Sequence, residues 1–485
     1  VYDTLYRELD DNQRAKLKAY LERALDAHLK SMGGWLYNNP SNTVPTQCGA
    51  AGMAALTLLW ESPQAEKALA QTRRKLVRYI SRCAPEDGGY IEGVLYWDFG
   101  MSYYLMFAHA LYNATGDAGL IDHPRLRKQH RFVETVLGGD GHMMPFNDAQ
   151  PNLAGMAVCA DLGSRFDNEL MLWLADFMAA EKAGENDDGP SVSVSSRGVF
   201  VALAALLREE KREPRDFPGL PTLSHLEAMQ WGAMRSGPEF VPELVVGVKG
   251  SEGRLSHHKH KDLGSFILYG RGEMLLLDPG YHHAAASSHT LPLVNGKGPG
   301  HNGARIVDAA EGRHWRTMTV DATRAYGKAA QRVRRVIVMH GDDAVVVLDD
   351  IIPAGNGKIT AQYQAAHKTT IDKDGHALVH GRQATLGLWT FGPELKLAVA
   401  KRDFGKSWTF QMRAEKGVFA WHAVTGAYTP AAARPLVTVL VTDRAGRSPS
   451  VPRCTYRETG IDVALPGGRR AHFESGPDGW RFHQP

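Results

Sequence analysis

The side chains best suited to chemistry gather in a histidine-rich stretch, residues 255–296. Two short apolar runs within it, 265–269 and 274–277, are joined by a Gly-Arg-Gly turn and predict a β-hairpin. The polar candidates lie at one end of this hairpin and in the loop that follows it; they are His257, His258, His260, Asp278 and His289. Imidazoles and a carboxylate held together can bind a metal ion or carry out acid–base chemistry.

A purely structural explanation of the same residues stays open. The chain has 21 histidines, so three of them within four residues can belong to a solvated loop. Asp278 precedes a Pro-Gly pair, and an aspartate there favours a turn. The spacing of His260, Asp278 and His289 does not match a regular metal motif such as HExxH. Residue types alone therefore leave a metal site and a polar loop as alternatives.

Apolar residues recur with helical periodicity over the first ~210 residues, which predicts a series of consecutive helices. Any functional side chain in this part of the chain would be positioned by these helices. Gly, Pro, Asn and Asp in the intervening loops are the expected helix breakers. This spacing predicts an array of antiparallel helical hairpins. The expected helices cover residues 12–32, 50–60, 65–83, 99–113, 124–137, 168–182 and 195–210.

A charged, proline-rich segment at 208–221 marks the expected boundary between two domains. Beyond it the apolar pattern changes to a period of two, which predicts an antiparallel β region folded as a sandwich. We therefore expect an α+β multidomain chain, with a helical domain over residues 1–215 and a β-sandwich over residues 216–485. The second domain has room for a small C-terminal β subdomain.

Composition narrows the classes of protein. The 485 residues are 43% hydrophobic and 22% charged, with a net charge of +3, as in an ordinary globular protein. No basic stripe indicates a nucleic-acid partner, and no apolar run is long enough to span a membrane. Four scattered cysteines without a CxxC pair predict neither a disulfide framework nor a zinc ribbon. The sequence starts at Val1 without Met, which fits either a removed leader or a trimmed chain, and no signal peptide is visible in it. We expect a periplasmic or secreted protein, with a cytoplasmic protein as the alternative.

Two loops of the helical part also carry polar and aromatic candidates. Residues 37–44 read YNNPSNTV, which can be a turn and helix cap or a set of amides for a ligand. Residues 87–100 read DGGYIEGVLYWDFG. Tyr96 and Trp97 in this second segment can be core rings or rings that face a carbohydrate.

Several of these segments resemble the heparinase II/III-like polysaccharide lyase family. The run HHKHKDLGSFILYGRGEMLLLDPGY, residues 257–281, is similar to the family's HxHxDxGSF and GE…DPGY strands in order and spacing. SSHTLPLVNGKG, residues 287–298, resembles its third segment, except that Thr290 stands where the family usually has Asn. The resemblance implies an α/α toroid, an incomplete barrel of helical hairpins, followed by an antiparallel β-sandwich.

The same resemblance implies a metal site in the sandwich domain. His260, Asp278 and His289 match the family's metal triad, which would hold one structural zinc ion with a water as fourth ligand. His283 and His301 are the alternatives if His289 is not the third ligand.

In the helical domain, the resemblance implies catalytic and substrate-binding residues. Tyr96 matches the catalytic tyrosine, and Asn42 matches the residue that binds the substrate carboxylate, with Asn39 as the next candidate. Glu92 and Trp97 from the same motif are expected to contact substrate. Residues 143–148, MMPFND, resemble the family's third helical-domain loop.

The reaction that these residues fit is β-elimination on a uronic-acid polysaccharide, such as alginate or a heparan-type glycosaminoglycan. Asn42 would neutralise the substrate carboxylate, and Tyr96 would act as the acid and as a candidate base. His258 is the other candidate base, and Tyr281 is the reserve acid–base group.

Two functions of other classes compete with this prediction. Helical toroids also occur in glycoside hydrolases, for which Glu92, Asp98 and Asp148 could supply the two carboxylates. A protein that binds carbohydrate without turning it over would keep the aromatic residues and show no activity.

Overall fold

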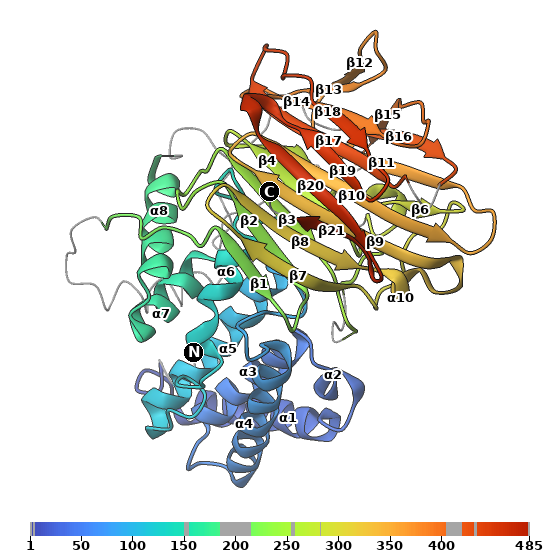
Figure 1. The fold of residues 1–485 in the computed structure, drawn as a ribbon. Helices are drawn as coiled ribbons and strands as arrows, with labels where there is room; N and C mark the ends of the chain where they lie inside the picture. Colours follow the sequence, from blue (N-terminus) through green and yellow to red (C-terminus); the bar gives the residue numbers. More distant parts are fainter. Residues whose placement is uncertain are drawn as a thin grey trace. The chain divides into compact units, whose positions relative to one another are not determined.

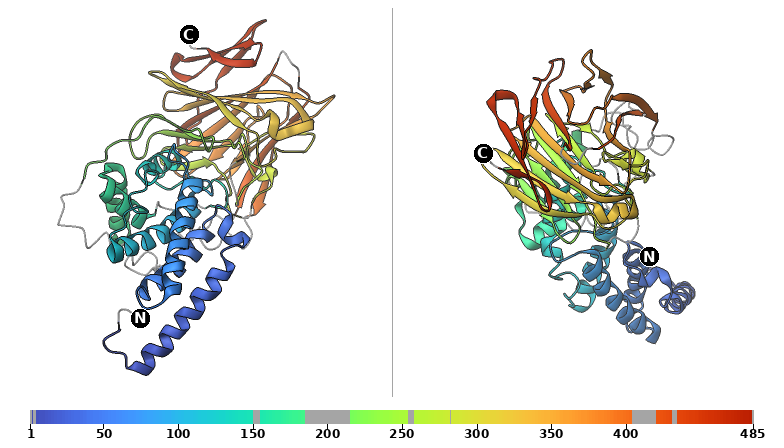
Figure 2. Two further views of the ribbon diagram at one scale, coloured as in Figure 1. Left: turned by 90° about the horizontal axis from the view of Figure 1, so that it is seen from below. Right: turned by 45° about the vertical axis from the view of Figure 1, so that its right-hand side comes forward.

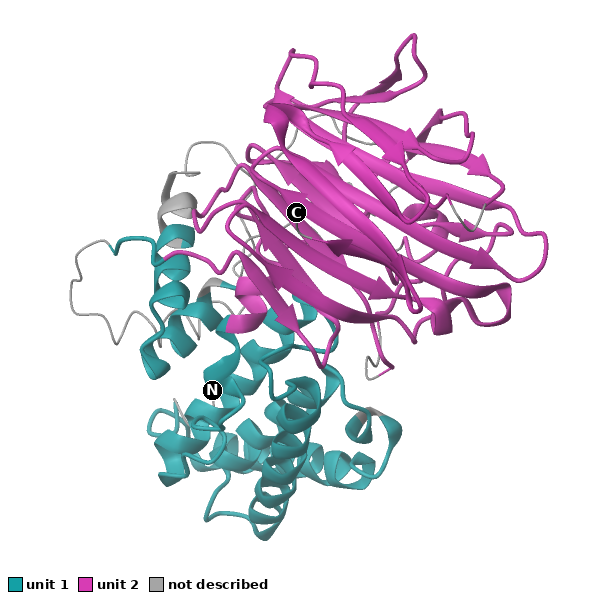
Figure 3. Ribbon diagram, viewed as in Figure 1, with its two compact units in different colours: residues 1–130, 154–218 teal, residues 131–153, 219–485 magenta. Residues whose placement is uncertain are grey.

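A computed structural model gives the fold of the chain. It describes residues 2, 5–149, 155–184, 215–253, 258–281, 283–403, 420–430 and 434–483. Contacts divide the chain into two compact units, residues 1–130 with 154–218 and residues 131–153 with 219–485 (Figure 3). The helix expected over 195–210 lies outside the described residues. The domain boundary expected between 215 and 216 adjoins that stretch and stays a prediction.

The first unit is helical, as its sequence periodicity predicts (Figure 1). Apolar residues of α1, α3 and α4, among them Leu25, Ala55 and Ala68, form one shared core. The longest helix, α5, is buried along most of its length because its sequence is apolar on nearly every face. The described helices are α1 (Asp11–Ser31), α2 (Trp35–Asn38), α3 (Thr43–Thr57), α4 (Pro63–Cys83), α5 (Val94–Thr115), α7 (Met156–Phe166) and α8 (Glu169–Gly184), with a 3-10 turn at Leu126–Lys128. The helix α6 (His130–Val136) begins at the last residue of this unit's first segment and otherwise belongs to the second unit.

The second unit consists of antiparallel sheets, and every strand pair among its described residues is antiparallel. The first sheet contains β1 (Leu223–Leu226), β2 (Trp231–Arg235), β3 (Leu244–Lys249), β4 (Phe266–Gly270), β5 (Glu273–Leu276), β11 (Ile359–Ala365), β16 (Ala420–Tyr428) and β15 (Ala398–Asp403) in that spatial order, with β6 (Leu293–Val294) paired to β11.

Two further sheets complete this unit. The second runs in the order β12 (Thr369–Ile371), β13 (Ala377–His380), β14 (Ala384–Phe391), β17 (Leu436–Arg444), β10 (Ala344–Pro353), β9 (Ala330–His340), β8 (Trp315–Asp321) and β7 (Arg305–Glu311). The third runs β18 (Arg453–Tyr456), β19 (Gly460–Ala464), β20 (Arg470–Gly476) and β21 (Gly479–His483). The short helix α10 (Thr323–Tyr326) and 3-10 turns at Ala286–Ser288, Gly327–Ala329 and Pro466–Gly468 lie between strands.

The second sheet is the middle layer, which explains its continuous apolar strands. Along β10, Val345 and Val347 join the core shared with the first sheet, whereas Val346 and Leu348 join the core shared with the third. Alternate residues of a strand face opposite sides, so a strand buried on both faces must be apolar throughout. Figure 2 shows the red C-terminal strands lying against this layer.

The hairpin predicted in the histidine-rich stretch is confirmed as β4 and β5. Arg271 and Gly272 at its tip both have positive φ, 53° and 83°, as a two-residue type I′ turn requires. This turn fixes the register of the strands, and the loops that carry the polar candidates lie before β4 and after β5. Among the described helices, none is both long and apolar enough to cross a membrane.

Candidate active site and metal centre

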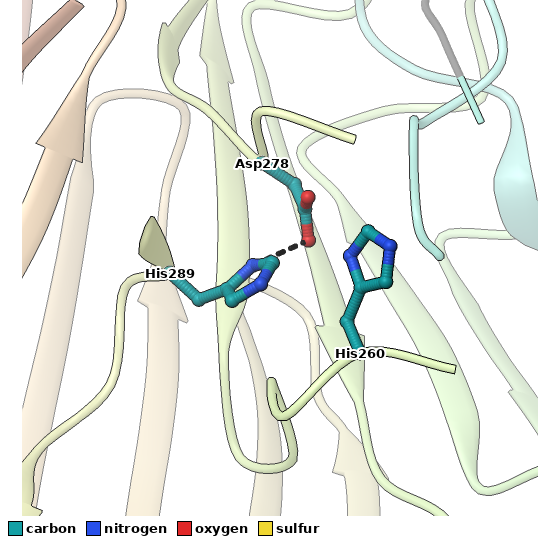
Figure 4. Close-up of side chains that lie close together, drawn as sticks. All are labelled: His260, Asp278 and His289. Atoms are coloured by element: carbon teal, nitrogen blue, oxygen red, sulfur yellow. Dashed lines mark hydrogen bonds and ion pairs between the residues drawn. The ribbon is translucent and has the colours of Figure 1, made fainter. Parts of the chain in front are cut away.

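Three of the predicted metal ligands come together in the second unit (Figure 4). His260 precedes β4, Asp278 follows β5, and His289 follows the 3-10 turn at Ala286–Ser288. All three side chains are buried, and the ligand atoms they offer lie within 4.8 Å of one another. The structure therefore supports the predicted grouping of these residues, and the group could hold a metal ion. His283 and His301 do not belong to this group among the described residues.

Charge and hydrogen bonding organise the cluster around Asp278. One oxygen of its carboxylate contacts Nδ1 of His289 at 3.1 Å, and the other accepts a hydrogen bond from the backbone nitrogen of Gly280 at 2.8 Å. Burial raises the pKa of Asp278, but the facing His289 outweighs burial, so the net pKa is lowered. Burial lowers the pKa of His289, but Asp278 raises it more. The two side chains therefore form an ion pair in the absence of a metal.

Two ring nitrogens in this cluster give a test of metal binding. His260 Nδ1 and His289 Nε2 are buried, and neither has a hydrogen-bond partner among the described residues. Buried polar atoms are nearly always satisfied, so such atoms call for a partner. Two imidazoles and a carboxylate are a donor set that zinc and similar divalent ions accept. The residues present therefore fit a bound metal ion.

Asp148 joins this cluster to the candidate base. Its two carboxylate oxygens contact His258 Nδ1 at 2.8 Å and His260 Nε2 at 3.0 Å. Burial raises the pKa of Asp148, but the hydrogen bonds from both imidazoles outweigh it and hold the pKa below its usual range. Asp148 is thus an ionised acceptor that orients both histidines. The sequence offered Asp148 as a hydrolase carboxylate and as the last residue of the segment 143–148 that resembles a family loop, but not as a partner of these histidines.

A buried lysine, which the sequence did not indicate, pairs with an aspartate at the end of the loop that carries His258 and His260. Lys249 on β3 donates to Asp262 and to the side-chain oxygen of Asn147, and all three are buried. Asp262 lies two residues after His260 in the HxHxD pattern. A buried ammonium needs such partners, because an unpaired buried charge is very costly. The aspartate of the pattern therefore anchors the loop rather than binding the metal.

In the helical unit, Asn42 and Glu92 are paired. Asn42 precedes α3, and Glu92 precedes α5. The backbone nitrogen of Asn42 donates to one Glu92 oxygen at 2.5 Å, and its side-chain amide donates to the other at 3.1 Å. Glu92 also accepts a 3.4 Å hydrogen bond from the Tyr90 hydroxyl, which contacts the Tyr79 hydroxyl at 2.5 Å.

Gly100 allows this polar group to lie against α5. A Cβ added at Gly100 would overlap the hydroxyl groups of Tyr79 and Tyr90 and lie 3.5 Å from Asn42 Cβ. Tyr96 is four residues before Gly100, one turn earlier on the same face of the helix. Tyr96 is partly exposed, whereas its neighbour Trp97 is fully buried. Asn42 and Tyr96 are thus brought to one face of α5.

The remaining predicted residues have other surroundings. The indole of Trp97 donates to Gln129 at 2.9 Å, which favours the core role for this ring over the predicted substrate contact. Asn39 follows α2 and lines a small pocket beside α4. Tyr281 is partly exposed, and its backbone nitrogen donates to the carbonyl of Ala149, next to Asp148. The catalytic roles of these residues stay predictions.

Comparisons with known proteins bear on the fold. No family model and no curated protein sequence matches the chain. Solved structures do match it. A heparinase III gene product is 14% identical to this chain with a TM-score of 0.67, and the match covers 92% of this chain and 68% of the heparinase chain. A second heparinase III structure is 14% identical with a TM-score of 0.67, over 90% of this chain and 68% of its own.

Heparan sulfate lyase HepC from Pedobacter heparinus is 13% identical with a TM-score of 0.64, over 90% of this chain and 66% of its own. The chain has the heparinase III fold. The likeness spans both units, so the predicted α/α toroid followed by an antiparallel β-sandwich is confirmed. The resemblance noted in the sequence motifs is likewise confirmed at the level of the polysaccharide lyase fold.

Proposed function

We propose that the chain is a polysaccharide lyase that cleaves a uronic-acid-containing polysaccharide by β-elimination. The observation that carries this proposal is the amide of Asn42. A buried Glu92 fixes this amide, and Asn42 lies next to Gly100, one turn of α5 after Tyr96. This arrangement occurs in a chain with the heparinase III fold, and its side chains are of the types that the reaction needs. The product would carry an unsaturated uronate at its new end.

Elimination begins with loss of the C5 proton, which is acidic because it lies beside the uronate carboxyl group. The developing charge spreads onto that carboxyl and must be stabilised there. One N–H of the Asn42 amide is used by Glu92, and an amide nitrogen has a second N–H to donate. Asn42 would therefore donate to the substrate carboxylate as charge builds up on it.

A base must take the C5 proton, and an acid must protonate the leaving oxygen. Tyr96 is the proposed acid, because a phenol can donate a proton and this side chain is partly exposed. His258 is the proposed base or its helper, with Tyr281 in reserve. The Asp148 carboxylate fixes the His258 ring through Nδ1, so proton transfer would use Nε2.

One zinc ion is the proposed cofactor, held by His260, Asp278 and His289. When bound, the ion would supply a fixed positive charge that ties together the loops around the β4–β5 hairpin. We assign this ion a structural role. Asp148 contacts both the ligand His260 and the candidate base His258, so order in these loops would also order the base.

The hydrolase alternative is less well supported. Hydrolysis needs one carboxylic acid that is protonated, and the two imidazoles hold Asp148 in the ionised form. Glu92 is buried and already accepts both Asn42 hydrogen bonds. A binding protein without activity remains the other outcome of the test.

Substrate and location follow from the same proposal. The partner would be an acidic polysaccharide or oligosaccharide, and one structural neighbour is named as a heparan sulfate lyase. A polymer of this kind would be met in the periplasm or outside the cell, so we propose a periplasmic or secreted protein.

The test is an ultraviolet-absorbance time course on alginate, heparan sulfate, hyaluronan, chondroitin and a glucuronan, because the unsaturated uronate absorbs and its precursor does not. A rise on any polymer that disappears with Tyr96→Phe, in a variant that melts like the original chain, supports the proposal. New reducing ends without a rise would replace it by the hydrolase. No change in either assay would leave a binding protein.

A further inference from the structure

We propose that α4 and the loop between α2 and α3 form an anion-binding pocket that holds a sulfate or carboxylate group of an acidic glycan. Both possible groups are oxyanions on a sugar. This inference rests on the proposed function only in taking a glycan as the ligand, and the pocket lies within the helical unit.

The pocket is open to solvent, and three cations line it. Lys75, Arg78 and Arg82 all belong to α4 and are spaced by three, four and seven residues. Side chains with this spacing share one face of a helix. Asn38, the last residue of α2, and Asn39, which follows it, also line the pocket, and no carboxylate is among the lining residues.

Within the described part of the chain, the cations of the pocket lack acidic partners such as a neighbouring arginine has. Arg73 on the same helix pairs with Asp117. Among the described residues, no hydrogen bond or ion pair engages the exposed guanidinium groups of Arg78 and Arg82. Burial lowers the pKa of Lys75, and the charge of Arg78 lowers it further. Positive charge in the pocket is therefore uncompensated within the described part of the chain.

Lys75 is already held in place before any ligand arrives. Its ammonium donates to the Asn38 side-chain oxygen at 2.6 Å, and the Asn38 amide donates to the carbonyls of Gly33 and Gly34 at 2.8 and 2.9 Å. The Lys75 ammonium keeps two further donors for a ligand. Arg78 and Arg82 add planar guanidinium groups, each of which can donate two parallel hydrogen bonds to two oxygens of a carboxylate or a sulfate. Together these groups would replace the water shell of an oxyanion.

The pocket is connected to the proposed catalytic residues within the same unit. Tyr79 lines it, and the Tyr79 hydroxyl contacts Tyr90, which donates to the Glu92 carboxylate that holds Asn42. Asn39 and Asn42 are three residues apart, so their Cα atoms are at most ~11 Å from each other. A glycan with one uronate at Asn42 could thus place a neighbouring anionic group in the pocket.

The test compares binding of two hexasaccharides of equal length, one a sulfated heparan type and one its unsulfated counterpart. Dissociation constants are measured by calorimetry on full-length Tyr96→Phe chains, with and without Arg78→Gln and Arg82→Gln. Arg74→Gln is the matched control, because Arg74 is exposed on the same helix and does not line the pocket. Arg82 is in the last turn of α4, where a cation interacts favourably with the helix dipole and stabilises the helix. Melting temperatures are therefore recorded for all chains, so that a loss of stability is not taken for a loss of binding.

We expect the Arg78→Gln and Arg82→Gln pair to weaken binding about tenfold or more at low salt, and less at high salt, because salt screens exposed charges. Loss confined to the sulfated sugar assigns a sulfate, and an equal loss for both assigns a carboxylate. Binding no weaker than in the Arg74→Gln control, for both sugars, would overturn the proposal. Elimination by the original chain is read separately by ultraviolet absorbance, so failure of the pocket and failure of the lyase proposal give different results.

Discussion

The Glu92 carboxylate holds Asn42 at both its backbone nitrogen and its side-chain amide, at 2.5 and 3.1 Å. Both residues are buried, although 50 positions separate them in the sequence. The pair of hydrogen bonds fixes the rotamer of the amide and the direction of its second N–H. A group that stabilises developing charge works best when it needs no reorganisation, so this relationship would prepare Asn42 for catalysis.

Glu92→Gln is expected to lower kcat on the uronate substrate by about 10²-fold, because the new amide would present a donor to the Asn42 donor and displace it. Loss of the paired hydrogen bonds should also lower the free energy of unfolding by about 1–3 kcal/mol. Steady-state kinetics and thermal melts measure the two effects. Glu66→Gln on the surface of α4 is the control. An unchanged kcat in Glu92→Gln would show that the pairing does not serve catalysis.

Gly100→Ala is expected to damage the same site although alanine favours helices. The new methyl group would overlap the hydroxyls of Tyr79 and Tyr90, and overpacking of this kind costs about 1–3 kcal/mol. Because Asn42 Cβ is also next to this position, kcat should fall with stability. Melting temperature and elimination rate measure the outcome.

Gly49→Ala in α3 is the matched control for this substitution. A Cβ there would meet only Tyr103 O at 3.4 Å and Phe107 Cβ at 3.8 Å, which is ordinary contact. Helix propensity alone then stabilises the variant by up to about 1 kcal/mol. If Gly100→Ala behaved like Gly49→Ala, the packing of the tyrosine pair against α5 would not be as close as described.

The sequence predicted helices followed by antiparallel strands because apolar periodicity reports this order directly, although α2 and α7 were not among the expected helices. Expected helices over 50–60 and 65–83 correspond to α3 and α4, and the Gly-Arg-Gly turn predicted the β4–β5 hairpin. The helix expected over 99–113 begins earlier, at Val94, because Gly93 has a positive φ of 90° and precedes a buried helical face. This earlier start places Tyr96 and Trp97 on the helix.

Relationships between distant residues could not be read from spacing. Asp148 meets His258 across 110 positions, and Lys249 meets Asn147 across 102. No local pattern encodes such pairs, because they depend on how loops of different elements pack. The resemblance of residues 143–148 to a family loop drew attention to Asp148, but it did not indicate the contact with His258. The cation pocket was missed for the same reason, since its Lys75 is held by Asn38 at the end of α2, 37 positions away.

The pH dependence of stability should include a contribution from His28. Burial lowers its pKa from 6.5 to about 4, and its Nδ1 contacts the Tyr37 hydroxyl at 3.0 Å. The unfolded chain therefore takes up a proton near pH 6.5 that the folded chain takes up only near pH 4. The contribution of neutral His28 to the free energy of unfolding is therefore complete above about pH 6.5 and is lost as the pH falls toward 4.

His28→Gln should reduce the drop in melting temperature between neutral pH and about pH 5, because the substituted side chain does not titrate. Melts of both chains at a series of pH values test this. His314→Gln, at an exposed histidine, is the control and should follow the original chain. An identical pH profile for His28→Gln and the original chain would mean that His28 is not buried in a neutral form.

Asp278→Asn is expected to remove the bound metal and the stability that the metal confers, because an amide is a much poorer ligand than a carboxylate. The substitution also breaks the ion pair with His289, so a lower melting temperature alone is not decisive. The decisive readout is chelation. A chelator should destabilise the original chain, by about 2.7 kcal/mol if metal stood at 100 times its dissociation constant, and should leave Asp278→Asn unchanged. His301→Gln should keep both the metal and the response to chelator, and a full metal content in Asp278→Asn would exclude the assigned ligands.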